Sequence, residues 1–406
     1  MPSMNAVFLA GLFPDNLRKE IEWNSKGPIQ YAADALQWSF VQGLDYYYRT
    51  KIINLPYVGA YPNLYKRSYV MPCTFQHVSG ANDISLGFLN LPIIKHYFRY
   101  IKAKNELKKW GLSSQSRKII FIYAMHSPFI KAAVEIKKQC PEVEICLIIP
   151  DLPQYMSSKN TPIYRMLKAI DSIIIKKSLS KIDYFVLLSD HMAEYLNIAE
   201  RPWVRVEGIF NPLDYNIKGT SKEKNKTIFY AGTLDCRYGI LNLINAFRAI
   251  DNDDYRLWIC GDGECRAEIE KQAKFDTRIK YWGQQPRENV LVMQRKATIL
   301  VNPRTSEGDY TKYSFPSKTI EYLASGTPCI MHRLAGIPEE YYKYCFVADN
   351  ENAEGLKEMI LNVFSKNQVE LDEIGKKAAS FVYDGKNPKE QVRKIFNMIN
   401  LQSQRN

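Results

Sequence analysis

The chain has 406 residues, more than a single hydrophobic core usually accommodates, so we expect two domains. Apolar residues make up 46% of the chain and charged residues 24%, a globular composition that excludes a disordered or fibrous protein. The net charge of +12 indicates anionic partners, which means nucleic acid, phosphorylated small molecules or an acidic membrane surface.

The amino terminus and the cysteines bear on where the protein works. Residues 1–14 lack a basic segment and a long apolar segment, so they suit a buried strand better than a signal peptide. No stretch approaches the ~18 apolar residues that cross a bilayer. We therefore expect a cytoplasmic protein, with peripheral attachment to the inner face of the cell membrane left open. The eight cysteines form no C-x-x-C pair and have no histidine nearby, so we expect reduced, mostly buried thiols, no bound metal and no cofactor. These cysteines are Cys73, Cys140, Cys146, Cys236, Cys260, Cys265, Cys329 and Cys345.

Short apolar runs alternate with helical patterns along the whole chain, which predicts parallel βαβ units. The polar segment 219–226 precedes a new strand and marks a domain boundary. We expect an α/β protein in which two Rossmann-like domains, residues 1–208 and residues 209–385, face each other across a cleft. Residues 386–406 would form a carboxyl-terminal amphipathic helix that crosses back to the first domain or stays with the second. The predicted strands are 6–10, 118–124, 144–149, 184–188, 227–231, 256–260, 299–302 and 327–331.

Two polar residues in the first half directly follow predicted strands. His126 comes after the predicted strand 118–124, and Asp151 comes after the predicted strand 144–149. Carboxyl ends of parallel strands supply ligand contacts, so Asp151 could bind hydroxyl groups or accept a proton from the acceptor. The alternatives are a structural histidine and a turn cap ahead of Pro153.

Two glycine-bearing turns follow strands in the second half. In YAGTLDCRYG, residues 230–239, Gly232 lets the backbone approach a phosphate and Arg237 can pair with phosphate oxygens; the alternative is an ordinary turn with a surface arginine. In LWICGDGECR, residues 257–266, Gly261 and Gly263 lack the third glycine of the dinucleotide fingerprint. This departure argues against an NAD-dependent enzyme.

The segment PSKTIE, residues 316–321, predicts the start of a helix with ligand-binding groups. Pro316 suits a first helical position, and Ser317 and Glu321 stand on one face near the positive end of that helix. A carboxylate there can hold two ribose hydroxyls, while Ser317, Lys318 and free N–H groups contact a diphosphate. The alternative is a capped surface helix.

Several motifs occur in a fixed order over most of residues 227–350: YAGTL with RYG, CGDG, YWG, VNPR and FPSKTIEYLASGTPCI. Their order resembles that of the retaining glycosyltransferases of family 4, which have the GT-B fold. The resemblance is strongest to bacterial enzymes that assemble capsular, exopolysaccharide or O-antigen repeat units. It implies that the first domain, residues 1–208, binds the acceptor and that the second, residues 209–385, binds the donor nucleotide.

This resemblance implies roles for particular residues. Glu321 looks like the second glutamate of the E-x7-E motif, which binds the donor ribose. Arg237 and Lys318 look like the cations that neutralise the leaving diphosphate, and Gly283 lies in what looks like the base-binding loop. In the first half, the segment around Gly27 resembles the family's glycine loop that lines the cleft; the alternative is a simple turn. His126 stands in the region where a histidine of the family contacts the donor sugar or phosphate.

The chain also departs from the family pattern. Tyr313 stands where the first glutamate of E-x7-E is expected, so its contact with the donor sugar should differ. Thr233 and Tyr238 replace the usual arginine and lysine of the phosphate pair, which leaves Arg237 as the substitute, with Arg304 or Lys312 helping. The D-x-D sequence at residues 251–253 lies in a polar turn, and we interpret it as a turn and not as a metal site.

Basic residues interleaved with aromatic ones predict a second kind of surface at residues 93–110. This pattern is typical of a helix that lies on an anionic membrane, and equally of a Rossmann helix with a basic solvated side. The cations are Lys95, Arg99, Lys102, Lys104, Lys108 and Lys109, to which Lys168, Lys176, Lys177 and Lys181 add.

The sequence thus predicts a metal-independent, retaining glycosyltransferase. It would move a sugar from a nucleoside diphosphate donor, a UDP-sugar, to a polyprenyl-diphosphate-linked saccharide. The alternatives are a GT-B-fold UDP-sugar epimerase and a basic nucleic-acid-binding protein, although the ordered motifs argue against nucleic acid as a partner.

Overall fold

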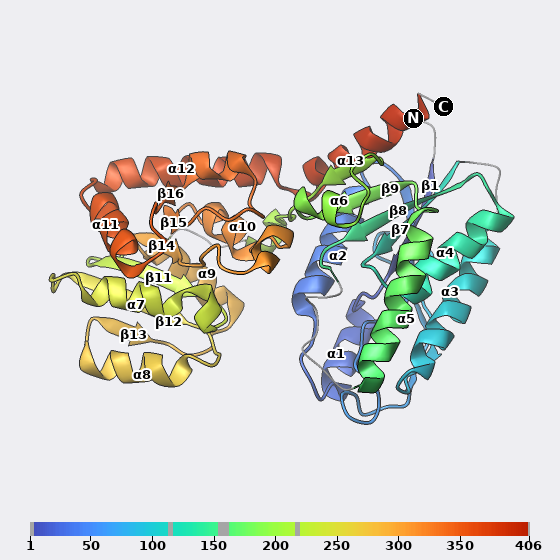
Figure 1. Ribbon diagram of the computed structural model, residues 1–406, viewed down its shortest axis with the longest axis horizontal. Helices are drawn as coiled ribbons and strands as arrows, with labels where there is room; N and C mark the ends of the chain where they lie inside the picture. The colour runs from blue at the N-terminus through green and yellow to red at the C-terminus, as the bar shows by residue number, and fades with distance from the viewer. Residues whose placement is uncertain (1–3, 113–116, 153–161, 216–219, 405–406) are drawn as a thin grey trace. The chain divides into compact units, whose positions relative to one another are not determined.

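The computed structural model describes residues 4–112, 117–152, 162–215 and 220–404. The chain divides into two compact units, residues 1–206 with 388–406 and residues 207–387, which we call unit 1 and unit 2. The sequence predicts limits after residues 208 and 385, whereas the units divide after 206 and 387. Each unit is a parallel or mostly parallel sheet covered by helices (Figure 1).

The large sheet of unit 1 has the strand order β10-β9-β8-β7-β1-β2-β5-β4. Neighbours pair in parallel except β4, which is antiparallel to β5. Because β1 lies between β2 and β7, the order of the chain reverses there, and such a switch point commonly holds ligands at the carboxyl ends of the strands. The bounds are β1 (Asn5–Ala10), β2 (Arg49–Asn54), β4 (Cys73–Phe75), β5 (Asp83–Ser85), β7 (Lys118–Tyr123), β8 (Val143–Ile149), β9 (Tyr184–Leu187) and β10 (Trp203–Arg205), and β3 (Tyr69–Val70) pairs separately with β6 (Phe88–Leu89).

The central strands β1, β7 and β8 are buried over nearly their whole length, which explains their continuous runs of apolar residues. Helices α3, α4 and α5 lie side by side on unit 1 (Figure 1). The helices of this unit are α1 (Asp15–Asn24), α2 (Tyr31–Leu44), α3 (Ile94–Gly111), α4 (Ser127–Gln139), α5 (Pro162–Leu179), α6 (His191–Tyr195) and α13 (Pro388–Ser403).

The carboxyl-terminal helix α13 packs against α2 and so belongs to unit 1. The rings of Tyr47 and Phe396 stack with their centroids 4.8 Å apart. Gly43 is required at this contact, because a Cβ there would lie 2.4 Å from the carbonyl oxygen of Pro388. The apolar face of α13 predicts a docking surface, and the structure supplies it through α2.

The sheet of unit 2 has the order β13-β12-β11-β14-β15-β16, and all its strands are parallel. The order of the chain reverses at β11, which lies between β12 and β14. The predicted two-domain α/β class is therefore confirmed. The strands are β11 (Lys226–Ala231), β12 (Tyr255–Cys260), β13 (Ile279–Tyr281), β14 (Ile299–Asn302), β15 (Cys329–Met331) and β16 (Phe346–Val347).

Helix α7 (Ile240–Arg248) shows why these residues fold onto the sheet. Its apolar stripe of Ile240, Leu243, Ile244 and Phe247 is fully buried in the core of unit 2, as its spacing predicts. The other helices are α8 (Arg266–Phe275), α9 (Arg287–Lys296), α10 (Ser317–Ala324), α11 (Ala353–Phe364) and α12 (Gln368–Gly385), with short 3-10 helices η2 (Pro212–Tyr215), η3 (Cys236–Tyr238), η4 (Asp309–Tyr313) and η5 (Glu339–Tyr344).

A buried ion pair joins the first and last segments of unit 2. Lys386 is 3% exposed and Glu207 is 2% exposed. Lys386 Nζ lies 2.6 Å from a carboxylate oxygen of Glu207 and 2.6 Å from one of Glu340. The Tyr341 hydroxyl donates to the same oxygen of Glu207 at 2.8 Å. The segment that enters unit 2 is thus fixed to the segment that leaves it.

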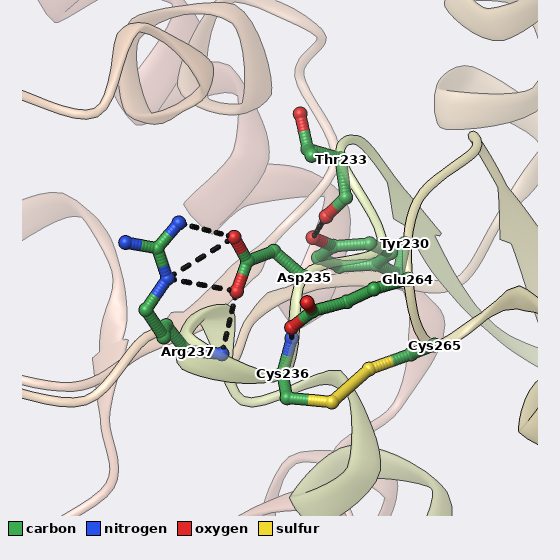
Figure 2. Close-up of a disulfide and its surroundings, with 7 residues drawn as sticks. All are labelled: Tyr230, Thr233, Asp235, Cys236, Arg237, Glu264 and Cys265. Atoms are coloured by element: carbon green, nitrogen blue, oxygen red, sulfur yellow. Dashed lines mark hydrogen bonds and ion pairs between the residues drawn. A yellow bond between two sulfur atoms is a disulfide. The ribbon is translucent and has the colours of Figure 1, made fainter. Parts of the chain in front are cut away.

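One expectation about the cysteines is wrong. Cys236 and Cys265, which are 29 residues apart, form a disulfide, whereas the sequence predicts reduced thiols throughout (Figure 2). The bond joins η3 to the residue that precedes α8, because β11 and β12 are neighbours whose following loops meet at one edge of the sheet. Sequence spacing shows no such pairing, since the two loops come together only in the folded sheet.

Candidate functional site

A cavity of about 410 Å³ lies at the carboxyl ends of β11 and β12 in unit 2. It brings together six residues that the sequence singles out: Gly232, Thr233, Gly261, Ser317, Lys318 and Glu321. The other lining residues are Ala231, Cys260, Asp262, Gln284, Gln285 and Val290. Three loops, helix α9 and the first one and a half turns of α10 therefore form one site.

Lys318 fills the space that a side chain at position 232 would need. A Cβ on Gly232 would lie 1.1 Å from Lys318 Nζ, so only glycine allows the lysine to sit there. The ammonium lies 4.9 Å from the centroid of the Tyr230 ring, a cation–π contact. Burial lowers the pKa of Lys318 to about 8, although the Glu321 carboxylate opposes this shift. The lysine is thus still mostly cationic at neutral pH.

Glu321 is held in place by side chains that the sequence does not single out. Gln294 Nε2 donates to Glu321 Oε1 at 2.6 Å, and Arg287 lies 4.0 Å from the other carboxylate oxygen. The Tyr215 hydroxyl donates to the backbone oxygen of Glu321 at 2.8 Å and lies 3.2 Å from Gln294 Oε1. Glu321 remains partly exposed to the cavity, so its carboxylate can accept hydrogen bonds from a ligand.

The first turn of α10 adds favourable charge for an anion. Ser317 is exposed, and Pro316 precedes it as the N-cap residue. The first N–H groups of a helix have no acceptor within it, and the helix dipole is positive there. Ser317, these N–H groups and the Lys318 ammonium together make one anion-binding corner of the cavity.

Arg237 does not line this cavity. Its side chain is 69% exposed and pairs with Asp235, with Nε 3.0 Å from one carboxylate oxygen (Figure 2). Asp235 also accepts from the Arg237 backbone N–H at 2.9 Å as the N-cap of η3. The carboxylate raises the pKa of Arg237. A role in binding phosphate would require Arg237 to exchange this partner for the ligand, and it stays a prediction.

Three other residues singled out in the second half also lie in unit 2 outside the cavity lining. Gly283 has a φ of 65°, a conformation that favours glycine, and it precedes two lining glutamines. Tyr313 is the last residue of η4 and is partly buried. Arg304 packs on the rings of Tyr238 and Tyr310 and donates to Ser314 Oγ at 3.0 Å.

The residues predicted in the first half lie in unit 1. His126 precedes α4, and burial together with Arg99 lowers its pKa well below the ordinary value, so its ring is neutral at pH 7. Asp151 follows β8 and is exposed, yet desolvation raises the pKa of its carboxyl group to about 6. Gly27 lines a small cavity of about 50 Å³ with Tyr57 and Val58.

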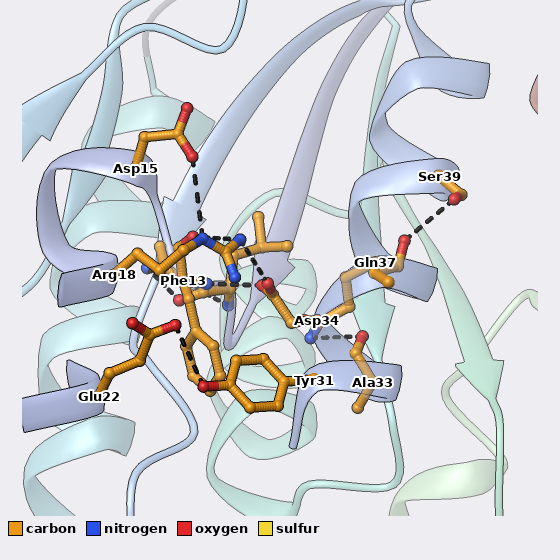
Figure 3. Close-up of polar contacts among 12 residues, drawn as sticks. Phe13, Asp15, Arg18, Glu22, Tyr31, Ala33, Asp34, Gln37 and Ser39 are labelled. Atoms are coloured by element: carbon orange, nitrogen blue, oxygen red, sulfur yellow. Dashed lines mark hydrogen bonds and ion pairs between the residues drawn. The ribbon is translucent and has the colours of Figure 1, made fainter. Parts of the chain in front are cut away.

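The loop after β1 in unit 1 is closed by polar side chains. The backbone N–H groups of Gly11 and Leu12 donate to Gln37 Oε1 at 2.9 Å and Asn54 Oδ1 at 2.7 Å. The N–H of Phe13 donates to the buried Asp34 carboxyl group at 2.7 Å, which also accepts from Arg18 at 2.8 Å (Figure 3). These N–H groups are therefore not available to a phosphate.

The groups that could hold a metal ion in the described part of the chain are limited to Cys236, Glu264 and Cys265. The two sulfur atoms are bonded to each other, as Figure 2 shows, so they are not thiolate ligands. The expectation of a metal-independent site stays a prediction.

Comparison with known proteins follows the same division of the chain. Residues 214–387, which is most of unit 2, match the family described as glycosyl transferases group 1. No curated protein sequence matches the chain.

Solved structures resemble the chain over its whole length. Sucrose-phosphate synthase from Thermosynechococcus elongatus is 15% identical over 99% of this chain and 100% of its own, with a TM-score of 0.62. Anabaena HepE in complex with UDP is 10% identical over 98% and 100%, and the lipopolysaccharide outer core galactosyltransferase WaaB is 13% identical over 98% and 100%, both with a TM-score of 0.62. The fold is thus GT-B, and together with the domain match it supports a glycosyltransferase.

The structure adds residues to this candidate site that sequence reasoning misses, chiefly Gln294, Tyr215 and Tyr230. Gln294 is fully buried on α9, and a buried amide needs a partner, which here is Glu321. The only signal in the sequence is a glutamine within an otherwise amphipathic helix. Among the described helices, none is long and apolar enough to cross a membrane.

Proposed function

We propose that this chain transfers a sugar, with retention of anomeric configuration, from a UDP-sugar to a polyprenyl-diphosphate-linked saccharide in the synthesis of a cell-surface polysaccharide. The observation that carries the donor half of the proposal is the cavity in which Lys318, Ser317 and Glu321 meet. The HepE structure is in complex with UDP, which supports uracil as the base.

In this proposal, the ribose, the diphosphate and the base of the donor each contact a different part of the cavity. The Glu321 carboxylate, oriented by Gln294, accepts hydrogen bonds from the two ribose hydroxyls. The diphosphate lies against Lys318, Ser317 and the amino terminus of α10. The base lies toward Gln284 and Gln285, in the loop that begins at Gly283. The donor therefore binds with its charge at the cationic corner of the cavity.

The same groups assist the departure of the leaving group. Negative charge grows on the diphosphate as the bond to the sugar breaks, and a fixed cation and helix amino terminus stabilise that charge. We assign no side chain of the cavity lining as a nucleophile, so the acceptor hydroxyl attacks on the face from which the diphosphate leaves. Of the candidates in unit 1, Asp151 serves in removal of the acceptor's proton, for which a pKa of about 6 suits it, and His126 serves in contacts to a phosphate group.

The lipid-linked acceptor implies a membrane surface at unit 1, on the cytoplasmic side. The basic face expected on α3 is partly used within the fold, because Arg99 is buried and Lys104 and Lys109 pair with acids. Helix α5 offers a better surface: Met166, Ile170 and Ile173 follow one another at helical spacing, are 48–59% exposed, and are flanked by the exposed Lys176 and Lys177.

The test of the donor site is calorimetry of UDP binding. Glu321→Gln should lower the affinity for UDP at least about tenfold, because the ribose hydroxyls lose a charged acceptor. Glu288→Gln, an exposed glutamate in the first turn of the neighbouring helix α9, is the control and should bind UDP as the wild type does. Equal affinities for wild type and Glu321→Gln would refute the assignment. A panel of nucleotide sugars in a thermal-shift assay then identifies the donor.

Two alternatives predict different products. A GT-B-fold UDP-sugar epimerase would convert the nucleotide sugar without an acceptor, which NMR of the sugar detects directly. A nucleic-acid-binding protein would bind oligonucleotides with strong salt dependence and without regard to Glu321. For the proposed transferase, NMR of the product should show the anomeric configuration of the donor retained.

A further inference from the structure

A cluster of nitrogen side chains lies in unit 1 where α3 and α4 begin. Lys95, His96 and Arg99 come from the first two turns of α3, and His126 precedes α4. Arg99 Nη1 lies 3.4 Å from His126 Nε2, and the rings of His96 and His126 stack with their centroids 5.7 Å apart. We call these four residues the α3–α4 cluster. Four groups that can carry positive charge therefore share one place.

Two donors of the cluster are buried without an acceptor. Arg99 is 3% exposed; its Nη2 donates to the Pro56 carbonyl, and its guanidinium lies on the Phe88 and Tyr57 rings. Within the described part of the chain, Arg99 Nε and His126 Nδ1 have no hydrogen-bond partner. Arginine only donates, so His126 Nε2 accepts and the neutral ring carries its proton on Nδ1. Two N–H groups thus remain that a ligand could satisfy.

The charges of the cluster are not balanced by acids. The described carboxylates form no ion pair with any of its four members, and Lys95 Nζ donates to the Val58 carbonyl at 3.4 Å. On the neighbouring elements, Ser127 donates to Asp171, and the Tyr57 hydroxyl donates to the Tyr123 carbonyl at 2.8 Å. Burial and mutual repulsion lower the pKa of Lys95 to about 8 and that of His96 to about 4.

Two residues beside the cluster have backbone conformations that are rare for residues with side chains and that often occur at functional sites. Ile93 and Ala124 have φ values of 65° and 68°, in the left-handed region that side chains, and above all branched ones, avoid. Such conformations persist at sites where the surroundings require them. Here they precede the amino termini of α3 and α4, whose dipoles add positive potential at the cluster.

We propose that the α3–α4 cluster binds a phosphate or diphosphate group. Unpaired buried donors, unbalanced cations and two helix amino termini are together the features that an oxyanion satisfies. The source of the anion rests on the proposed function: the acceptor carries a diphosphate, whereas the donor's diphosphate has its own corner at Lys318. The cluster thus fixes the charged end of the acceptor in unit 1.

The test uses the full chain and inorganic pyrophosphate. The protein has five histidines, so imidazole resonances are few enough to resolve by NMR. Pyrophosphate should shift those of His96 and His126 and raise their pKa values, while His191 should not respond. Lys95→Met and Arg99→Met should weaken the pyrophosphate binding that the His96 and His126 resonances report at least about tenfold. Lys102→Met, an exposed lysine of the same helix, should leave it unchanged.

The outcomes separate this inference from the proposed function. The inference would be overturned if the His96 and His126 resonances did not shift at saturating pyrophosphate. It would also be overturned if a Lys95→Met variant, shown by its thermal unfolding transition to be folded, gave the same His96 and His126 response to pyrophosphate as the wild type. If Lys95→Met weakens UDP as much as pyrophosphate, the anion belongs to the donor and the acceptor assignment is wrong. A pyrophosphate response of the His96 and His126 resonances without any sugar transfer would leave the anion site standing and refute the proposed function.

Discussion

Gly232→Ala tests the contact between Gly232 and Lys318 on which the donor site depends. The new Cβ would lie 1.1 Å from Lys318 Nζ and 2.5 Å from its Cε, so the ammonium must leave its place over Tyr230. The obstacle is the far end of a flexible side chain, and we expect the free energy of unfolding to change by less than about 1 kcal/mol. Loss of a charge-assisted contact costs about 1.5–3 kcal/mol, which corresponds to UDP binding weakened roughly 10- to 100-fold.

A double-mutant cycle with Lys318→Met isolates the physical cause. Once the ammonium is absent, Gly232→Ala has less to displace, so the double variant should bind UDP only slightly more weakly than Lys318→Met alone. Gly385→Ala is the control, because a Cβ there meets no atom within 4 Å. Calorimetry supplies the affinities and urea unfolding the stabilities. Additive losses of binding energy in the cycle would refute the reasoning, as would a Gly232→Ala variant with wild-type affinity.

Three further predictions concern charge. UDP affinity should fall as the pH rises through about 8, where Lys318 loses its proton, and Lys318→Met should remove this part of the pH profile measured by calorimetry. Lys386→Met leaves Glu207 buried without its cation, which should cost about 3–5 kcal/mol in urea unfolding, whereas Arg333→Met at an exposed pair should cost less than about 1 kcal/mol. His77 is bound by Asp83 and Asp45, which raise its pKa to about 9 against the opposing effect of burial. Its contribution of about 3 kcal/mol should be complete below pH 6.5 and lost as the pH rises through 9, measured as the difference between wild type and His77→Gln.

The parts of the fold that the sequence predicts are those with continuous apolar runs. The eight predicted strands correspond to β1, β7, β8, β9, β11, β12, β14 and β15. It misses β2, whose segment RTKIIN mixes charge with apolar residues, and it misses short strands such as β10, β13 and β16. A strand of two or three residues leaves too little periodicity to recognise, and its pairing depends on the sheet already present.

The candidate site is predictable as far as it is local. Ser317, Lys318 and Glu321 lie within one turn and a half of α10, so their shared face follows from helix geometry alone. Gln294, which orients Glu321, comes from a different helix 27 residues earlier. The Cys236–Cys265 bond likewise joins residues that are distant in the sequence, because adjacent strands bring the two loops together. Contacts of this kind follow from the fold and carry no spacing signal.

The two units share an architecture but differ in the charge of the side chain at the loop that follows the first strand of each sheet. In unit 1 the N–H groups after β1 are occupied by Gln37, Asn54 and Asp34, and an acid at this position disfavours a phosphate. In unit 2 the corresponding loop after β11 begins with Gly232, and a lysine ammonium occupies the space that its missing side chain leaves. A phosphate approaching each sheet by the usual route thus meets a carboxyl group in one unit and a cation in the other. This difference in charge, and not the fold that both units share, is why we assign the nucleotide to unit 2.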